Sequence, residues 1–375
     1  MTSKEHKKHA FLQKPLGGKF NRNEFALIGA PCPVIQQLAT SITKTLEKEY
    51  KIGYVDADHG VGEEKPVFSR RYTDKISHHR LEFQQKDLSY AFRGHFNAED
   101  AVLINGNHFQ ASRQIVIINE QKKESLGKKL DRLTHVIMIL LDDGMEDVHD
   151  FLKEHIPDHA SLPTFSIREV DRAAETLRSL LATEAPRIKG LVLAGGDSTR
   201  MGQDKGVIHY HGKAQREFMA DLLSQFCEET YISKKPSKSI ESQYPFIEDS
   251  FLDLGPYGGI LSAFRHDPNA AWLCVACDIP MLDHLALEKL VKGRDASQLA
   301  TCFHNPDMGF PEPLITLWEP RAYPALLYFL SLGYSCPRKV LINSDVKTLE
   351  LKDTQVLTNV NTPEEYEKVK SKINA

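Results

Sequence analysis

Short apolar runs alternate with longer amphipathic segments along most of this 375-residue chain. Apolar runs bounded by polar residues are typical of buried strands, and a helical apolar period is typical of helices that cover a sheet. On this pattern the first half contains strands over 25–30, 51–58, 100–106, 114–119 and 134–143, and helices over 34–48, 145–155 and 168–182. The second half contains strands over 188–194, 228–232, 271–277 and 313–318, and helices over 214–226, 258–266, 283–292, 320–332 and 362–373.

This alternation predicts crossover connections, and therefore parallel pairing within each sheet. A polar stretch with a proline, TEAPRIK (183–189), separates the two runs of elements and reads as a linker. The expected organisation is a flexible, charged tail over 1–24, one domain over 25–185 and a second over 186–375. Both are expected to be three-layer α/β domains with mostly parallel sheets.

Composition and charge limit the partners of the chain. The 47 Lys and Arg residues against 51 Asp and Glu give a formal net charge of −4, so no overall field attracts nucleic acid or an anionic membrane. The longest clear apolar run, Val136–Leu141, is far shorter than the roughly 20 residues of a membrane-spanning helix. The amino terminus carries too much charge for a secretory signal. These features predict a cytoplasmic protein with no nucleic-acid and no membrane partner.

The six cysteines are scattered through apolar surroundings, as expected for reduced thiols in a cytoplasm. Cys274 and Cys277 form a C-x-x-C pattern, but they lie in WLCVACD, which reads as a buried strand with side chains on alternating faces. No second pair of ligands lies near them in the sequence, so core packing is favoured over a metal or redox role.

A glycine-rich, basic loop follows the first strand of the second half and reads LVLAGGDSTRMGQDKG (191–206). In open α/β sheets, ligands gather at the carboxyl ends of the strands. Gly195 and Gly196 let backbone amides approach an anion, while Arg200 and Lys205 supply positive charge. On their own these residues fit a solvated turn more simply than a phosphate site, and they do not form a Walker A motif.

The full string L-A-G-G-x-S-x-R-M-G-x-D-K resembles the signature loop of molybdenum cofactor guanylyltransferases, the MobA family of nucleotidyltransferases. Five further segments resemble motifs of that family in the same order, namely IEDSFLDLGPYGGILSAF (247–264), CVACDIPML (274–282), PEPLITLW (311–318), YFLSLGYSCPRKVL (328–341) and NVNTPEEY (359–366). The resemblance covers residues 186–375 and implies a Rossmann-like nucleotidyltransferase fold for the second domain.

The resemblance also implies roles for individual residues. Those implied for GTP binding are Leu193, Ala194, Gly195, Gly196, Lys205, Ser233, Asp249 and Gly255. The implied catalytic residues are Arg200, Lys205 and Asp278, and Asp278 is also the implied ligand of Mg²⁺. Asp249 would accept the N1 and N2 hydrogens of guanine. The phosphate-bearing pterin would face Arg338, Lys339, Asn359 and Asn361.

Departures from the family pattern affect this assignment. Ala214 and Gln215 stand where the family has a proline and an apolar residue, which bears on the entry of the following helix. Ser233 stands where many relatives carry an asparagine near the base, which bears on how the base is recognised. Asp253 is also close enough in the sequence to take the place of Asp249.

Each implied role has a structural alternative. Asp278 lies just before Pro280, where it fits the cap of a turn or helix. The run over 361–365, NTPEE, is a good helix start in its own right. Arg338 and Lys339 also fit a solvated surface pair.

The reaction implied by the resemblance is transfer of GMP from GTP to molybdopterin, with release of pyrophosphate and formation of the guanine dinucleotide form of the molybdenum cofactor. The terminal phosphate of the pterin is already ionised near neutral pH, so no general base is required among the 16 histidines. Catalysis then consists of alignment and charge neutralisation by Mg²⁺, cationic side chains and loop amides. The alternatives are cytidylyl transfer, transfer to a sugar phosphate, and a cofactor-binding protein without turnover.

The first half resembles MobB, the P-loop partner family of MobA, over residues 25–185. LIGAPCPVIQQLATSI (27–42) has the strand-to-helix position of a phosphate-binding loop, but Val34, Ile35 and Gln36 stand where a Walker A motif has Gly-Lys-Ser/Thr. Hydrolysis of an NTP there is not expected. The resemblance implies a degenerate domain that binds or positions the pterin, or binds a molybdoenzyme or chaperone that receives it.

Polar residues also follow other predicted strands of the first half. Asp56, Asp58, His59, Asn107 and His108 lie where strand ends meet and are candidates for a polar site. Roles in turns and caps are the simpler interpretation of all five.

Overall fold

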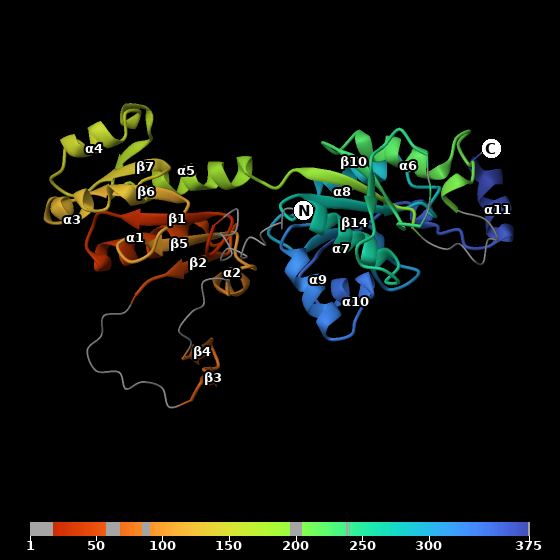
Figure 1. Cartoon of the computed structure of the whole chain (residues 1–375), viewed down its shortest axis with the longest axis horizontal. Helices are drawn as coiled ribbons and strands as arrows, with labels where there is room; N and C mark the ends of the chain where they lie inside the picture. Colours follow the sequence, from red (N-terminus) through yellow and green to blue (C-terminus); the bar gives the residue numbers. More distant parts are fainter. Residues whose placement is uncertain are drawn as a thin grey trace, which may run out of the picture. The chain divides into compact units, whose positions relative to one another are not determined.

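The computed structural model describes residues 18–57, 68–84, 91–195, 205–237, 239 and 241–373 of the chain. The chain divides into two compact units, Met1–Glu184 and Ala185–Ala375 (Figure 1). Helix α5 (Val170–Thr183) is the last element of the first unit, and strand β9 (Ile188–Leu193) is the first element of the second. The division therefore falls within the stretch that reads as a linker.

The first unit is built on a six-stranded sheet in which every pair of neighbouring strands is parallel. Its strands, in spatial order, are β2 (Ile52–Val55), β5 (Ala101–Asn105), β1 (Glu24–Ile28), β6 (Arg113–Ile118), β7 (Val136–Leu141) and β8 (Thr164–Ser166). The four central strands are apolar and almost wholly buried, as expected for a parallel sheet covered on both faces.

Helices cover both faces of this sheet (Figure 1). Helix α1 (Cys32–Leu46) and α5 pack against each other over one face, where Ile35 and Leu177 are buried in the core. Helices α3 (Lys123–Gly127) and α4 (Asp150–His155) contribute to the apolar cluster on the other face. The predicted three-layer arrangement is confirmed for this unit.

Shorter elements complete the first unit, and the apolar pattern did not predict them. They are α2 (Phe92–His95), the antiparallel pair β3 (Arg70–Asp74) and β4 (His79–Phe83), and the single-turn 3₁₀ helices η1 (Glu120–Lys122), η2 (Leu130–Arg132) and η3 (His159–Ser161). Elements this short carry too few residues for a period to stand out.

The segment just before β1 is packed into the first unit, so the predicted flexible tail over 1–24 is wrong from residue 18 onward. Residues 1–17 lie outside the described residues. Phe20 is fully buried against β5, and its backbone amide donates to the Glu24 carboxylate at 2.9 Å. A single aromatic anchor in a charged stretch has no periodicity, which is why the pattern of the sequence hid it.

The second unit is built on a seven-stranded mixed sheet. In spatial order its strands are β11 (Phe246–Glu248), β10 (Thr230–Lys234), β9, β12 (Ala271–Ala276), β14 (Phe310–Trp318), β13 (Ala300–Asn305) and β15 (Lys347–Leu349). Strand β14 runs antiparallel to both β12 and β13, and the remaining neighbours are parallel. The expectation of a mostly parallel sheet is confirmed.

Helices again form layers on both faces (Figure 1). One face is covered by α6 (Gln215–Ser224) and α8 (His284–Lys292), and the other by α7 (Pro256–His266), α9 (Ala322–Ser331) and α10 (Pro337–Ile342). The unit also contains α11 (Pro363–Ile373) and the 3₁₀ helices η4 (Lys205–Val207) and η5 (Gln355–Leu357). Helix α6 begins directly after Ala214, so the departure from the family pattern at that position does not prevent the helix entry.

The cysteines of the C-x-x-C pattern lie on opposite faces of the second sheet. Cys274 belongs to the core that includes α7, and Cys277 to the core that includes α6 and α8. All six cysteines lie among the described residues, and no disulfide joins any of them. The core-packing interpretation is confirmed, because alternating strand residues point to opposite faces.

No helix within the described ranges combines the length and the apolar character needed to cross a lipid bilayer.

Candidate active site

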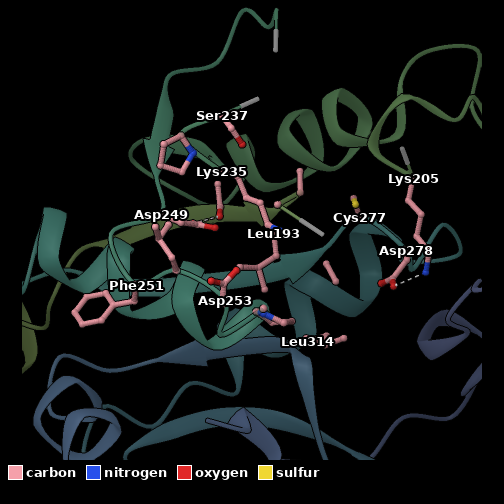
Figure 2. Close-up of a pocket in the computed structure, with 18 of the residues that line it drawn as sticks. Leu193, Lys205, Lys235, Ser237, Asp249, Phe251, Asp253, Cys277, Asp278 and Leu314 are labelled. Carbon is pink, nitrogen blue, oxygen red and sulfur yellow. Dashed lines mark hydrogen bonds and ion pairs between the residues drawn. The ribbon is translucent and has the colours of Figure 1, made fainter. Parts of the chain in front are cut away.

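A pocket of about 530 Å³ opens where β9, β10 and β12 end (Figure 2). The parallel register pairs Leu193 with both Ser233 and Ala276, which brings the loops after these strands to one edge of the sheet. The residues that line it are Leu193, Ala194, Gly195, Lys205, Ser233, Lys235, Pro236, Ser237, Asp249, Phe251, Leu252, Asp253, Gly255, Pro256, Ala276, Cys277, Asp278, Leu314 and Asn361. In Figure 2, Asp249 and Lys235 lie toward one end of the pocket, and Lys205 and Asp278 toward the other.

At one end of the pocket, Lys205 is held between two side chains from distant parts of the chain. Its Nζ lies 3.1 Å from Oδ2 of Asp278 and donates to Oδ1 of Asn361 at 2.7 Å. The Lys205 and Asp278 side chains are only 15% and 18% exposed, so the surrounding water screens their interaction weakly. The arrangement aims a partly buried ammonium group at the pocket.

The carboxy-terminal segment joins this end of the pocket through the backbone. The Val360 amide donates to the Asp278 carbonyl at 2.8 Å, which places Asn361 beside Lys205. Thr362 and Glu365 form a capping box at the start of α11: the Glu365 amide donates to Thr362 Oγ1, and the Thr362 amide donates to Glu365 Oε2. Thr362 therefore caps the helix, whereas the side chain of its neighbour Asn361 lines the pocket.

The Asp278 side chain does not act as the cap suggested by its place before Pro280. The following helix, α8, is capped by Asp283, which accepts from the Ala286 amide at 2.8 Å. One oxygen of Asp278 accepts from Lys205, while Oδ1 is buried and has no hydrogen-bond partner among the described residues. An uncompensated buried carboxylate oxygen is costly, so this oxygen in the pocket is a candidate contact for a ligand.

The unpartnered oxygen of Asp278 fits Mg²⁺. Magnesium prefers carboxylate oxygens and commonly takes only one or two of them from the protein, with the remaining ligands from substrate phosphates and water. No group of three or more His, Cys, Asp or Glu side chains that could hold a metal ion occurs within the described residues. Among the described residues, Asp278 could therefore supply one ligand of a magnesium ion whose other ligands come from a substrate and water.

At the other end of the pocket, Asp249 is a half-buried carboxylate held by a hydroxyl group. Ser233 Oγ donates to Asp249 Oδ1 at 2.7 Å, from the end of the neighbouring strand. Burial raises the pKa of Asp249, and the Ser233 hydrogen bond and the charge of Lys235 act in the opposite direction. A partly desolvated acceptor of this kind recognises N–H groups selectively, because a ligand that lacks them leaves it unpaired.

Two glycines shape the turn between Asp249 and α7. Gly255 has φ 56° and ψ −137°, a conformation that side chains with a Cβ rarely adopt. A Cβ on Gly258 would lie 2.2 Å from the Phe251 carbonyl oxygen, so the loop can fold onto the helix only with glycine there. The two glycines of the G-P-Y-G segment (255–258) are thus explained by backbone geometry at the pocket wall.

The structure gathers nine of the predicted site residues around this pocket and leaves three others outside its described lining. The nine are Leu193, Ala194, Gly195, Lys205, Ser233, Asp249, Gly255, Asp278 and Asn361. Gly196 and Arg200 lie outside the described residues.

Arg338, Lys339 and Asn359 do not line the pocket. Arg338 stacks on the Phe310 ring and exposed Lys339 on the Tyr334 ring, at 4.8 and 5.0 Å from the ring centres. Asn359 has a buried Oδ1 without a hydrogen-bond partner among the described residues. The predicted contacts of these three residues with the pterin stay predictions.

Sequence reasoning missed two polar residues of the pocket, Lys235 and Ser237. Both follow β10, in the run SKKPS, and a strand end next to the signature loop is the signal that could have identified them. Asp253, the alternative to Asp249, also lines the pocket and has φ 59°. Its carboxylate lacks the serine partner that Asp249 has among the described residues, so Asp249 is the better-supported acceptor.

The corresponding edge of the first sheet carries a network of hydrogen bonds among its described polar residues. Asp56 accepts from Tyr54 Oη at 2.7 Å and from Asn105 Nδ2 at 2.8 Å. Asn107 donates to the Ala30 carbonyl at 2.8 Å, and His108 Nε2 lies 3.2 Å from Cys32 Sγ. These contacts agree with the simpler structural interpretation of Asp56 and Asn107. Asp58 and His59 lie outside the described residues.

A profile of the family described as MobA-like NTP transferase domain matches residues 190–347. The matched segment contains the pocket residues from β9 to Leu314 and ends before Asn361.

Curated relatives are similar to about half of the chain. The molybdenum cofactor biosynthesis bifunctional protein of Synechocystis sp. is 35% identical over 180 residues, which is 47% of this chain and 52% of that protein. The molybdenum cofactor guanylyltransferase of Photobacterium profundum is 30% identical over 190 residues, which is 49% of this chain and 95% of that protein. This chain thus spans about half the length of the bifunctional relative.

Among solved structures, the molybdopterin-guanine dinucleotide biosynthesis protein A of Archaeoglobus fulgidus matches with a TM-score of 0.44 at 24% identity. The match covers 50% of this chain and 98% of that protein.

Proposed function

This chain belongs to the family of MobA-like NTP transferases, and from that premise we propose that it transfers GMP from GTP to molybdopterin and releases pyrophosphate. The product is the guanine dinucleotide form of the molybdenum cofactor. The observation that carries the proposal is one pocket with two different ends. A half-buried carboxylate, Asp249, accepts from a hydroxyl group at one end, and a cation is held by Asp278 and Asn361 at the other.

The reaction needs alignment and charge neutralisation more than it needs proton transfer. An oxygen of the pterin phosphate forms a bond to the α-phosphorus of GTP, and the bond from that phosphorus to the bridging oxygen breaks, so negative charge passes to the leaving pyrophosphate. Lys205 can neutralise part of that charge because its ammonium group is already fixed by Asp278 and Asn361. The amide of Gly195 would add a donor at the end of β9.

Asp278 is the residue that would hold Mg²⁺, through the oxygen that Lys205 does not engage. When bound, such an ion would supply positive charge to the phosphates and orient them. The same carboxylate restrains Lys205, so one side chain would position both positive charges of this end.

Asp249 is the residue that would recognise the base. Guanine presents a ring N–H beside an exocyclic amine, which a carboxylate can accept together, whereas cytosine and adenine present a ring acceptor beside their amine. A neutral or misaligned Asp249 would lose this recognition, so the contact favours GTP over the other nucleotides. The selection of GTP rather than CTP therefore depends on this residue in our proposal.

The remaining parts of the proposal concern the pterin and the first unit. Arg338, Lys339 and Asn359 stay predicted contacts of the pterin phosphate, and the first unit stays a predicted MobB-like domain that positions the pterin, or binds a recipient molybdoenzyme or its chaperone. A cytoplasmic location is likewise a prediction.

The proposal is tested with the purified full-length chain, molybdopterin that carries molybdenum, and Mg²⁺. GTP, CTP or a sugar phosphate with GTP is added in separate reactions, and pyrophosphate and the dinucleotide product are quantified. We expect product with GTP and molybdopterin only. Product with CTP alone would assign the chain to cytidylyl transfer, and no product with any substrate would leave only a binding function for the pocket.

A further inference from the structure

The backbone brings Ser233 and Asp249 close together. Ser233 lies in β10, Asp249 directly follows the parallel neighbour β11, and the Asp249 amide donates to the Lys234 carbonyl at 2.9 Å. The hydroxyl of Ser233, a residue that is only 1% exposed, donates to Asp249 Oδ1 at 2.7 Å. The hydroxyl group of this pocket residue is thus engaged with the Asp249 carboxylate.

Two glycines from different elements leave the space that this pair needs. A Cβ on Gly259, in the first part of α7, would lie 2.9 Å from Ser233 Oγ. A Cβ on Gly195, just after β9, would lie 3.0 Å from Asp249 Oδ2. Glycine inside a helix is less stable than alanine, and its presence at Gly259 is explained by the room that it gives to the side chains of Leu193 and Ser233.

We propose that Ser233 is a specificity-determining positioning residue, whose hydroxyl fixes Asp249 Oδ1 so that Oδ2 faces the pocket as the acceptor for a base with adjacent N–H groups. The inference rests on the proposed function and deepens it. The proposal also accounts for the departure from the family pattern at this position. A serine stands where many relatives carry an asparagine, and in our proposal the serine influences the base indirectly, by positioning Asp249.

The pair also controls the charge of Asp249. Burial raises the pKa of this carboxyl group, whereas the Ser233 hydrogen bond and Lys235 lower it. The other charged groups nearby are Asp253 in the same pocket and the ion pair of Lys234 with Glu248 at 3.0 Å on the adjoining strands. Acceptance of N–H groups requires the carboxylate, so affinity for GTP should be present above the pKa of Asp249 and be lost as the pH falls through it.

Binding measurements on the full-length chain test the role of Ser233 without any need for turnover. Dissociation constants for GTP, inosine triphosphate, CTP and inorganic pyrophosphate are measured with Mg²⁺ across a pH series, for the wild type and for Ser233→Ala, Ser233→Thr and Asp249→Asn. Inosine triphosphate lacks the exocyclic amine of guanine. Pyrophosphate reports on the Lys205 end of the pocket alone, and melting temperatures report on folding.

We expect Ser233→Ala to weaken GTP binding by about tenfold or more near neutral pH, the scale of a hydrogen bond to a charged group. The pH at which GTP binding is half lost should rise, because the pKa of Asp249 is no longer lowered by the hydroxyl. The preference for GTP over inosine triphosphate should shrink, pyrophosphate binding should be unchanged, and Ser233→Thr should restore GTP binding. Asp249→Asn should weaken GTP binding with no remaining pH dependence from this group.

Two results would overturn the inference while leaving the proposed function in place. One is a wild type that prefers GTP and a Ser233→Ala chain with the same affinity and the same pH profile. The other is a Ser233→Ala chain in which GTP and pyrophosphate weaken equally, since that would mark a general structural role. A wild type without preference for GTP over CTP would overturn the proposed guanylyl transfer, and the inference with it.

Discussion

A central parallel strand ends at the same kind of place in both units, and among the described residues the second unit has a pocket lined by a carboxylate, Asp278, with an unpartnered oxygen. β1 lies between β5 and β6, and β9 lies between β10 and β12. Both strands therefore deliver their following loops to the edge where ligands bind in open α/β sheets. The strand order therefore brings both loops to a potential ligand-binding edge, and the side chains at the strand ends decide whether a ligand binds there.

The carboxylates of the two edges differ in how many of their oxygens have hydrogen-bond partners. Both oxygens of Asp56 accept side-chain hydrogen bonds, from Tyr54 and Asn105. Asp278 has one oxygen paired with Lys205 and another that is buried and unpartnered within the described residues. A satisfied network stabilises the fold, whereas an unsatisfied buried oxygen is tolerated where a ligand completes it.

The cations of the two edges differ in what holds them. In the first unit, Lys129 donates to the Asn107 carbonyl at 3.2 Å and Arg132 to the Gly106 carbonyl at 3.0 Å. Burial lowers the pKa of Lys129, and the neighbouring charge of Arg132 lowers it further. In the second unit, Lys205 is held by a carboxylate and an amide that both line the pocket. Among the described residues, Lys205 therefore lies in the lining of a pocket, whereas the Lys129 ammonium group is engaged by a backbone carbonyl.

The largest expected effect is on Asp278. Asp278→Ala should lower the rate of pyrophosphate release by about a thousandfold, since it removes both the restraint on Lys205 and the predicted metal ligand. The melting temperature should stay close to that of the wild type. The matched control is Asp56→Ala in the first unit, which should leave the rate unchanged. Equal losses of rate from both substitutions would contradict the assignment of catalysis to the edge of the second sheet.

Ile35 tests whether the first loop can be turned into a nucleotide site by one residue. Ile35 occupies the lysine position of a Walker A motif, but its side chain is fully buried in the core under α1. Ile35→Lys should therefore destabilise the first unit by about 3 kcal/mol, the cost of an unpaired buried charge in place of core packing, and should create no NTP hydrolysis. Denaturant unfolding and phosphate release measure the two effects.

The control for that substitution is Gln36→Lys, one position along, because Gln36 is exposed. It should change the free energy of unfolding by less than about 0.5 kcal/mol. An Ile35→Lys chain of wild-type stability that hydrolyses an NTP would mean that the first loop has kept a phosphate-binding geometry.

Substitution of Lys205 and of Lys129 tests the difference between the cations at the two sheet edges. Lys205→Ala should weaken the binding of inorganic pyrophosphate by about a hundredfold, the scale of a charge-assisted contact in a partly buried site. Lys129→Ala in the first unit should leave that binding unchanged, because Lys129 is engaged by a backbone carbonyl. Isothermal titration with pyrophosphate measures both, and similar losses from the two variants would contradict the assignment of the anion site to the second unit.

The smallest expected effect concerns the space around Ser233. A Cβ on Gly259 would lie 2.8 Å from the Leu193 side chain and 2.9 Å from Ser233 Oγ, so Gly259→Ala should displace the hydroxyl. We expect GTP affinity to fall by about threefold to tenfold, less than for loss of the hydroxyl itself. Gly94→Ala is the control, since a Cβ there meets nothing within 4 Å. Unchanged GTP affinity in Gly259→Ala would show that Ser233 is not tightly confined.

Much of the fold followed from the apolar pattern, and the exceptions have identifiable causes. Long strands such as β7 and β14 and amphipathic helices such as α5 carry enough residues for their period to be read. The strand predicted over 134–143 ends at Leu141, and the helix predicted over 145–155 begins only at Asp150. Between them the chain turns at Gly144, with φ 80°, and a turn of this kind leaves no trace in an apolar pattern.

The site was predictable where its residues lie in contiguous motifs. Lys205, Asp249 and Asp278 each follow a strand directly or stand in a family-like string, so their place at the pocket could be inferred before the fold was known. Lys235 and Ser237 lie in no such string, and Arg338 and Lys339, which do, lie outside the pocket lining. A motif identifies a segment, but which of its side chains face a pocket depends on the helix or loop that carries them.

Most strands and helices, and the residue types at their ends, could be inferred from the sequence, because they depend on neighbours within a few positions. The contact of Lys205 with Asn361, 156 positions away, and the capping of α11 by Thr362 could be seen only in the folded chain. The tertiary structure also decided that Ser233 serves Asp249 and that Ile35 and Phe20 are buried. Long-range hydrogen bonds and burial arise when distant segments pack together, and that packing is a property of the whole fold.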